Sequence, residues 1–307
     1  FTNTLTKTGD GTVSYASSKT DVATVNATTG EVTIVGAGEA TITATVADSD
    51  TYTYATKTAS YTLTVTQAVT YIGTKAPTEA KAVGDIVFSD GSATPYADGL
   101  TLTAEQKEAA ISVIFYAGTG LNSGDDTTTS RTLGVGLAQN QSGLAWCVSG
   151  AKANSRDITT IQCPAIGSAG SLTFTGDRNG SDNLSQIGDF LGGNDDTESE
   201  ASYPAFYFAK NYKSQTGSRV SGTDYESGWY LPSIAELFQI WTKMTDLNKA
   251  IALCAGTEFD LSKYYWSSSQ YASTGTIAYD LYFSDGGWGS YPKGFTDVYV
   301  CAVRAFN

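Results

Sequence analysis

Histidine is absent from this chain of 307 residues. Its absence excludes Ser-His-Asp and Cys-His nucleophile activation, and it excludes every zinc site that needs an imidazole ligand. An enzyme built on this chain would have to work without the commonest general base in proteins. We therefore expect no catalytic residues.

Cysteine is scarce as well. The four cysteines, Cys147, Cys163, Cys254 and Cys301, include no Cys-x-x-Cys pair, so neither a zinc knuckle nor a thioredoxin-like motif is present. Four cysteines can pair in three ways, and the sequence leaves open both disulfides and buried thiols. Cys254 and Cys301 lie in an apolar helix end and an apolar closing strand, where packing or a disulfide is more natural than catalysis.

Basic residues are few. Lys and Arg number 18 against 31 Asp and Glu, which gives a formal net charge of −13 and argues against a nucleic-acid partner. No apolar run approaches the length of a membrane span. The chain begins at Phe1 and not at Met, so we expect that an export signal or a lipid anchor has been removed and that any membrane contact is through that anchor.

What the chain has in abundance is Thr, Ser and Gly, a composition that favours strands and turns. Residues 1–66 alternate in short β-type runs at 22–25, 31–35, 40–46 and 61–65, broken by turn signals such as Thr29-Gly30. This pattern predicts a small all-β sandwich. The segment resembles the bacterial immunoglobulin-like group 2 family through Ser-Ser-x-x-x-Val-Ala-x-Val at 17–25 and Ala-Gly-x-Ala-x-Ile-x-Ala at 37–44. The resemblance implies a spacer or adhesion module on a bacterial surface.

Residues 70–307 are predicted to form a second domain. A strand over 82–91 ends in an Asp-Gly turn, a helix over 104–116 starts at the N-cap Thr103 with Gln106 at its third position, and short strands follow at 133–137 and 144–148. Residues 150–227 are rich in loops, and their aromatic run at 203–209 is typical of core. A second helix begins near Pro232 and carries an apolar stripe at helical spacing through Ile234, Leu237, Phe238, Trp241, Met244, Leu247 and Ile251.

Acidic residues occur in clusters within the predicted loops. Spaced carboxylates can hold calcium, but none of these clusters has the spacing of an EF-hand loop, so solvated loops are the favoured interpretation and we expect no metal and no cofactor. The residues are Asp125, Asp126, Asp177, Asp182, Asp195, Asp196 and Glu198.

A specific resemblance appears in the last third of the chain. Residues 228–237 match the pattern Gly-Trp-x-Leu-Pro-x-x-x-Glu-Leu, and they are followed by Tyr-Trp-Ser-Ser-Ser-Gln at 265–270 and Val-Arg-Ala-Phe at 303–306. The combination resembles the variable proteins of diversity-generating retroelements, whose C-type lectin fold is related to formylglycine-generating enzymes. It implies an α+β C-type lectin fold, a mixed and mostly antiparallel sheet with two helices, preceded by the all-β immunoglobulin-like sandwich. The calcium-binding tripeptides of sugar-binding lectins are absent, so calcium-dependent sugar binding is not expected.

For such proteins the resemblance implies a final segment, here about 264–306, whose sequence varies to change ligand specificity. This stretch is dense in Tyr, Trp, Ser, Asp and Gly, the residue types of binding loops. Strand alternation over 278–284 would place Asp280 and Tyr282 on the site, with Tyr279 beside it. Trp288 is compatible with fixed scaffold as well, because randomised asparagine codons cannot encode tryptophan. The candidate ligand-binding residues are Tyr271, Ser273, Thr274, Tyr279, Asp280, Tyr282, Asp285, Trp288, Ser290, Tyr291, Phe295, Thr296, Asp297 and Tyr299.

The sequence therefore predicts a bacterial surface-displayed binding protein, an exported outer-membrane lipoprotein, that binds an extracellular protein or glycan and is not an enzyme. The alternative is an adhesin of invariant sequence that uses the same fold for a fixed glycan or matrix protein. An enzyme related to formylglycine generation is the least favoured class, because those enzymes rely on active-site cysteines.

Overall fold

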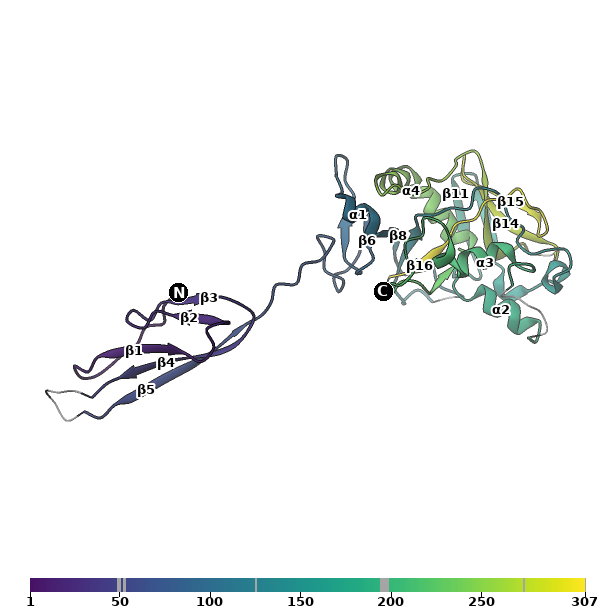
Figure 1. Ribbon diagram of the computed structural model, residues 1–307. Helices are drawn as coiled ribbons and strands as arrows, with labels where there is room; N and C mark the ends of the chain where they lie inside the picture. The colour runs from purple at the N-terminus through teal and green to yellow at the C-terminus, as the bar shows by residue number, and fades with distance from the viewer. Residues whose placement is uncertain (49–50, 52–53, 125, 194–198, 273, 307) are drawn as a thin grey trace. The chain divides into compact units, whose positions relative to one another are not determined.

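The computed structural model describes residues 1–48, 51, 54–124, 126–193, 199–272 and 274–306. The chain divides into two compact units, residues 1–70 and 71–307, each drawn in Figure 1. In the described part of the chain, no helix is both long and apolar enough to cross a membrane.

The first unit contains five short strands. Strands β1 (Val13–Ser17), β4 (Gly38–Val46) and β5 (Lys57–Val65) form one antiparallel sheet, and β2 (Ala23–Val25) pairs with β3 (Val32–Ile34). Val22, Ala23, Val32, Ala40 and Ile42 form its small core. The predicted all-β module is confirmed. The prediction missed β1, whose side chains alternate between exposed and half-buried positions and include no aliphatic cluster.

The larger unit is built on a six-stranded antiparallel sheet in the order β12 (Trp229–Tyr230), β16 (Val303–Ala305), β9 (Arg131–Gly136), β8 (Ala110–Gly118), β6 (Asp85–Phe88) and β7 (Ala93–Pro95). Both faces of this sheet are covered. Ile86, Val113 and Leu133 belong to one hydrophobic core, whereas Val87 and Ile114 belong to the other. The order places β16, which follows the last candidate residue Tyr299 in sequence, in the interior of the sheet.

A second sheet and a hairpin complete the β-structure. Strands β13 (Tyr264–Gln270), β14 (Ile277–Tyr282) and β15 (Gly287–Pro292) form an antiparallel sheet, and β10 (Ala165–Ser168) pairs with β11 (Ser171–Phe174). The three-stranded sheet contains most of the candidate ligand-binding residues, so it is the part of the fold that positions the candidate site.

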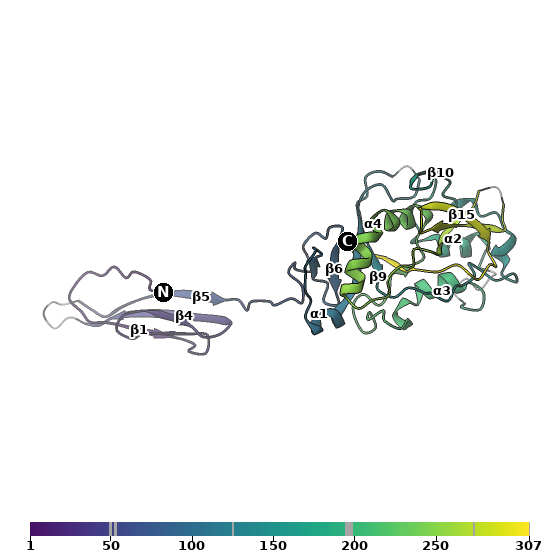
Figure 2. The same ribbon diagram turned by 90° about the horizontal axis from the view of Figure 1, so that it is seen from above.

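Four α-helices lie in the described residues, where the sequence predicted two: α1 (Ala104–Ala109), α2 (Asn183–Phe190), α3 (Pro204–Lys210) and α4 (Ile234–Leu253). Single turns of 3₁₀-helix occur at Lys152–Ser155, Thr159–Ile161 and Tyr212–Ser214. The predicted α+β class, mostly antiparallel with few helices, is confirmed. Helix α4, labelled in Figure 2, packs against β8, β13 and β14.

The predicted helix over 104–116 is wrong beyond its first half. Thr103 and Gln106 do form the expected capping box, but α1 ends at Ala109 and the chain continues as β8. The reason is that β8 is buried on both faces of the sheet, so Ile111, Val113 and Ile114 form a nearly continuous apolar run in which strand alternation cannot be seen.

One smaller prediction also fails, and one helix was not predicted. Residues 144–148 were expected as a strand, but they are irregular, although Trp146 and Cys147 are fully buried. The aromatic run at 203–209 does belong to the core, as expected, and its helical form as α3 was not predicted. Pro204 at the start of α3 is the signal for that helix, because proline is favoured in the first turn.

Candidate functional site

The three-stranded sheet separates the candidate residues onto two faces. Its register pairs Tyr279 with Ser290 and Leu281 with Trp288, and it pairs Asp280 with Gly289 on the opposite face. Paired residues of antiparallel strands point to the same side. The alternation predicted for Asp280 and Tyr279 is therefore confirmed, and each face carries its own group of aromatic side chains.

We call the group on the first face the Trp288 cluster; it consists of Tyr271, Tyr279 and Trp288. The ring centroids of Tyr271 and Tyr279 are 5.1 Å apart, and Trp288 lies 5.9 Å from the first and 5.5 Å from the second. Tyr279 is only 3% exposed and joins the core beneath the sheet, whereas Trp288 is 36% exposed. Trp288 thus presents an aromatic surface that Tyr279 supports from below.

The group on the second face, the Phe295 cluster, consists of Tyr264, Tyr282, Tyr291 and Phe295. Tyr264 stacks on Tyr282 with centroids 4.4 Å apart, and its ring meets Tyr291 edge-on at 5.4 Å. Phe295, which is 41% exposed, stacks on Tyr291 at 4.7 Å. Because the three tyrosines are half-buried, the cluster is a continuous aromatic surface and not a set of core side chains.

Asp280 was expected to face the ligand directly, but the structure buries it completely. Neither carboxylate oxygen accepts a hydrogen bond from another described residue. Burial raises the pKa of this carboxyl to about 8. The sequence could not reveal this burial, because alternation assigns a residue to a face of the sheet but does not tell how deeply neighbouring rings cover it.

The remaining candidates are dispersed. Asp285, Ser290, Thr296 and Asp297 are exposed, and Thr274 is half-buried. Tyr299 lies apart from both clusters, because its ring contacts Tyr265 at 5.7 Å and lies under the Lys263 ammonium at 5.2 Å. Ser273 is outside the described residues. The structure therefore brings together the aromatic candidates and leaves most of the polar ones at the edges.

Lys293 is a residue that the sequence interpretation missed. It is fully buried between the end of β15 and the preceding loops, where its ammonium donates hydrogen bonds to the Ala153 carbonyl at 2.7 Å and to Gln270 Oε1 at 2.9 Å. It also lies 4.6 Å from the Trp146 ring centroid. Burial lowers the pKa of Lys293 to about 8. These contacts fix the loop that presents Phe295.

The Gly-Trp-x-Leu-Pro-x-x-x-Glu-Leu motif has a structural role. Ser233 caps α4, and Glu236 completes the capping box by accepting from the Ser233 backbone N–H at 2.9 Å. The other oxygen of Glu236 accepts from Arg131 Nη1 at 2.8 Å and from the Tyr230 hydroxyl at 3.0 Å. Arg131 Nη2 also donates a hydrogen bond to the Tyr230 hydroxyl oxygen at 2.8 Å. The motif therefore joins the start of α4 to β9 and β12.

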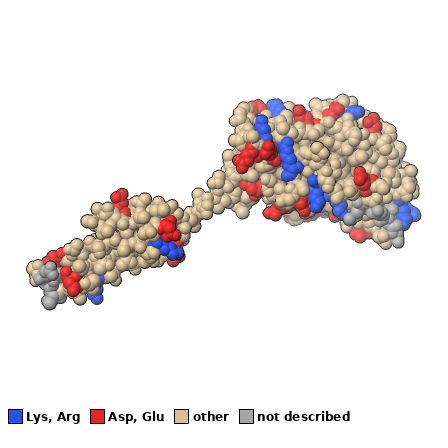
Figure 3. Space-filling view, in the orientation of Figure 1, with Lys and Arg blue, Asp and Glu red and all other residues tan. Residues whose placement is uncertain are grey.

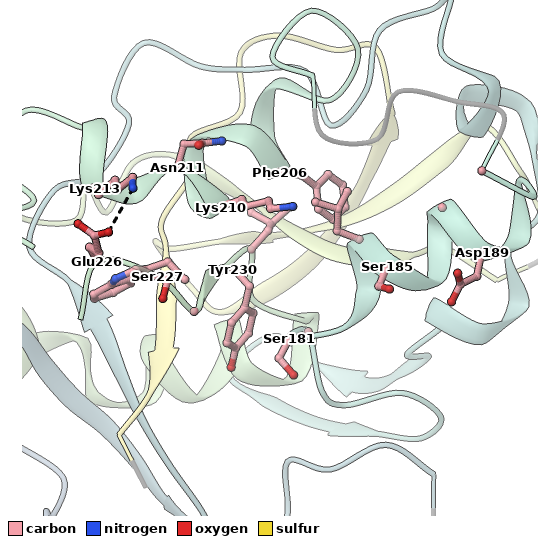
Figure 4. A pocket seen from close by; sticks show the side chains of 17 residues that line it. Ser181, Ser185, Asp189, Phe206, Lys210, Asn211, Lys213, Glu226, Ser227 and Tyr230 are labelled. Carbon is pink, nitrogen blue, oxygen red and sulfur yellow. Dashed lines mark hydrogen bonds and ion pairs between the residues drawn. The ribbon is translucent and has the colours of Figure 1, made fainter. Parts of the chain in front are cut away.

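A cavity lies near these elements and outside the candidate segment (Figure 4). It has a volume of about 720 Å³ and is lined by α2, α3 and residues 226–231, including Phe206, Lys213, Glu226 and Trp229. Lys213 and Glu226 form an ion pair at its edge, with Nζ and Oε1 3.4 Å apart. Its walls mix apolar and oppositely charged groups, so they favour no single class of ligand.

Neither the surface charge nor the thiols of the described residues indicate a catalytic or metal site. The face drawn in Figure 3 is mostly neither acidic nor basic. Among the described residues, no group of three or more Asp, Glu or Cys side chains is placed to hold a metal ion. The four cysteines are buried thiols, and burial raises the pKa of Cys163 and Cys254 to about 12. None of them is poised as a nucleophile.

Comparison with known proteins identifies the first unit. The sequence profile described as the intimin immunoglobulin-like domain matches residues 3–48. The chain thus begins with an intimin-type immunoglobulin-like module, while the assignment to group 2 stays a prediction. No curated protein matches the chain.

One solved structure is similar over most of the chain, a fimbrial protein from Bacteroides ovatus ATCC 8483. The identity is 14% and the TM-score is 0.48, and the match covers 95% of this chain and 63% of that protein. A likeness at this level carries no argument about function. Neither match bears on the resemblance to retroelement-diversified variable proteins, which stays a prediction.

Proposed function

We propose that this chain is a bacterial cell-surface binding protein of the adhesin class, and that residues 264–306 present its ligand-binding surface. The observation that carries the proposal is the Phe295 cluster, in which half-buried tyrosines and an exposed phenylalanine form one aromatic surface. Large rigid aromatic side chains are the usual anchors of binding surfaces. The intimin-type module supports a location on the cell surface. An outer-membrane lipid anchor remains an expectation.

The finer part of the proposal is a C-type lectin fold in which a retroelement rewrites the segment. Lys293 and the Arg131–Glu236 pair fix the frame through residues outside the two aromatic clusters. This arrangement supports the idea, because the aromatic residues could then change while the sheet stays rigid. The alternative is an adhesin of fixed sequence. Clonal variation confined to 264–306, or an imperfect copy of those codons beside a reverse transcriptase gene, separates the two.

We further propose that the protein is not an enzyme and that its partner is an extracellular protein or glycan. Support comes from the buried thiols, because burial raises the pKa of Cys163, Cys254 and Cys301 and so disfavours the thiolate that a nucleophile needs.

The test is a binding screen of the full chain against glycan and matrix-protein arrays, repeated with Phe295→Ser and Trp288→Ser. Loss of the recovered ligand in either variant is expected. The matched control is Ile166→Ser, because Ile166 is 58% exposed on β10 and lies outside both clusters. Equal binding by all three variants would place the binding surface elsewhere.

A further inference from the structure

Asp280 stands out among the buried polar groups of the larger unit. Its side chain is fully buried, and both carboxylate oxygens lack a hydrogen-bond partner among the described residues. Leaving a buried carboxylate unpaired is costly, and native structures rarely do so without a functional reason. Asp280 lies in the middle of β14, the central strand of its sheet, so the sequence keeps this group at a rigid position.

The sheet leaves room for the carboxylate on one side. Gly289 of β15 pairs with Asp280, and a Cβ atom at Gly289 would lie only 2.3 Å from Asp280 Oδ1. Gly287 pairs with Tyr282 in the same way. The edge strand β15 therefore contributes backbone but no side chain opposite these two residues.

Aromatic side chains enclose the carboxylate on the remaining sides. Trp266 pairs with Asp280 on β13. Tyr264 lies in the row of Tyr282, on one side of Asp280, and Tyr291 lies in the row of Ala278, on the other side. The rings of Tyr264 and Tyr291 nevertheless meet with centroids 5.4 Å apart, so they cross the row of Asp280 and close over it.

We propose that Asp280 is the anionic base of an aromatic-walled site that binds a lysine or arginine side chain of a protein partner. This inference rests on the proposed function and names the chemistry that the Phe295 cluster recognises. Tyrosine faces attract cations, and a guanidinium or ammonium group would supply the hydrogen bonds that the carboxylate lacks. The site opens when the Tyr264 and Tyr291 rings separate along the β15 edge.

The charge balance of binding follows from the groups that face Asp280. The register places Tyr264 of β13, Tyr282 of β14 and Tyr291 of β15 on the same face of the sheet as Asp280, while the ammonium of Lys263 lies 3.9 Å from Asp297 Oδ1. Burial raises the pKa of the Asp280 carboxyl to about 8, so the free protein holds a proton there at pH 7. A cation entering the site favours the ionised carboxylate, and that proton is released to the solvent.

The experiment is calorimetry of the full chain with Nα-acetyl-arginine methylamide at pH 7, in two buffers of different ionisation enthalpy. The expected result is binding with release of about one proton per ligand. Asp280→Asn should weaken binding about tenfold or more and abolish the proton release. The neutral isostere Nα-acetyl-citrulline methylamide should bind more weakly by a similar factor. Asp246→Asn, which changes an exposed carboxylate on α4, is the matched control and should behave as the unaltered protein.

Equal affinity of the unaltered protein and Asp280→Asn, or equal binding of the citrulline derivative, would overturn the inference. Tighter binding of tetramethylammonium than of the arginine derivative would also overturn it, because the occupant would then be a free quaternary amine. If Asp280→Asn does not fold, carbon NMR of the Asp280 carboxyl in the unaltered protein decides the question. Its pKa should fall when the arginine derivative is added, and an unchanged pKa contradicts the site.

The experiments can distinguish failure of the cation site from failure of the proposed function. A ligand from the array screen that depends on Phe295 or Trp288 but not on Asp280 would support the binding surface and reject the cation site. A ligand whose binding depends on none of Phe295, Trp288 and Asp280 would reject both the binding surface and the cation site.

Discussion

Arg131 and Glu236 lie 105 positions apart in the sequence, and their side chains form a buried ion pair with Nη1 and Oε1 2.8 Å apart. Removing one partner of such a pair leaves an uncompensated charge in the core, so we expect Arg131→Met to lower the free energy of unfolding by about 3–5 kcal/mol. All five tryptophans lie in the larger unit, so their fluorescence during urea unfolding reports on that unit alone. Lys213→Met, which breaks the exposed pair with Glu226, should change the same free energy by less than about 1 kcal/mol. Similar losses in the two variants would contradict the assigned role.

The aromatic surface and the core beneath it should respond differently to truncation. Trp288→Ser and Phe295→Ser alter partly exposed rings, so each should cost about 1 kcal/mol or less. Phe283→Ala removes a fully buried ring that packs on Phe259 and Tyr265, and it should cost about 3–5 kcal/mol. Thermal unfolding of the three variants checks this order, and a reversed order would show that the surface rings hold the fold together.

Asp280 should make stability depend on pH. Its pKa rises from 3.8 in a model peptide to about 8 in the folded protein, so between these values the folded state binds more protons than the unfolded state. The contribution of Asp280 is therefore present at low pH and is lost as the pH rises through the folded pKa. At about 1.4 kcal/mol per pKa unit, the loss is on the order of 5 kcal/mol.

Comparison with Asp280→Asn isolates this effect, because asparagine does not titrate. The free energy of unfolding is measured in urea at pH 5 and at pH 8.5 for both proteins. Relative to that of the variant, the value for the unaltered protein should be lower at pH 8.5 than at pH 5. A constant difference between the two proteins across this range would show that Asp280 is ionised throughout.

Gly289 should be sensitive to the smallest side chain. A methyl group there would lie 2.3 Å from Asp280 Oδ1, so Gly289→Ala should cost about 1–3 kcal/mol. In an Asp280→Ala background the opposing oxygen is gone, and the same substitution should cost less. A double-mutant cycle in urea measures the difference. Additive costs would mean that the two positions do not compete for space.

The thiols provide a test of the core. All four cysteines are buried and none is in a disulfide, so a maleimide should label none of them in the folded protein and four in urea. Mass spectrometry counts the adducts. Fewer than four labels in urea would indicate a disulfide, and labelling without denaturant would indicate an open core.

Much of the fold could be predicted because local signals agreed with tertiary structure. Pro232 and the apolar stripe from Ile234 onward predicted the second helix, and α4 begins at Ile234. The alternating runs at 40–46 and 61–65 likewise became β4 and β5. In both cases one face of the element is apolar and the other is not, so periodicity identifies the element.

The failures have the opposite cause. Residues 110–118 are buried on both faces, which removes the alternation that identifies a strand, so Thr103 and Gln106 correctly predicted the start of a helix but nothing in the sequence predicted its end. The candidate site was limited in a similar way. Alternation placed Asp280 on the face of Tyr282, but its burial depends on Tyr264 and Tyr291, which reach it from two other strands. Contacts of that kind are not encoded in local spacing.

The position of β16 has a consequence for shortened forms of this protein. Its residues, Val303–Ala305, are synthesised at the end of the 264–306 segment, after the last candidate residue Tyr299, yet they pair with β9 and β12 inside the central sheet. A nonsense codon or frameshift anywhere in that segment would remove the strand and leave the sheet split, with two newly exposed edges. The fold thus acts as a reading-frame check, because only chains translated in frame to the last strand can present the aromatic surface.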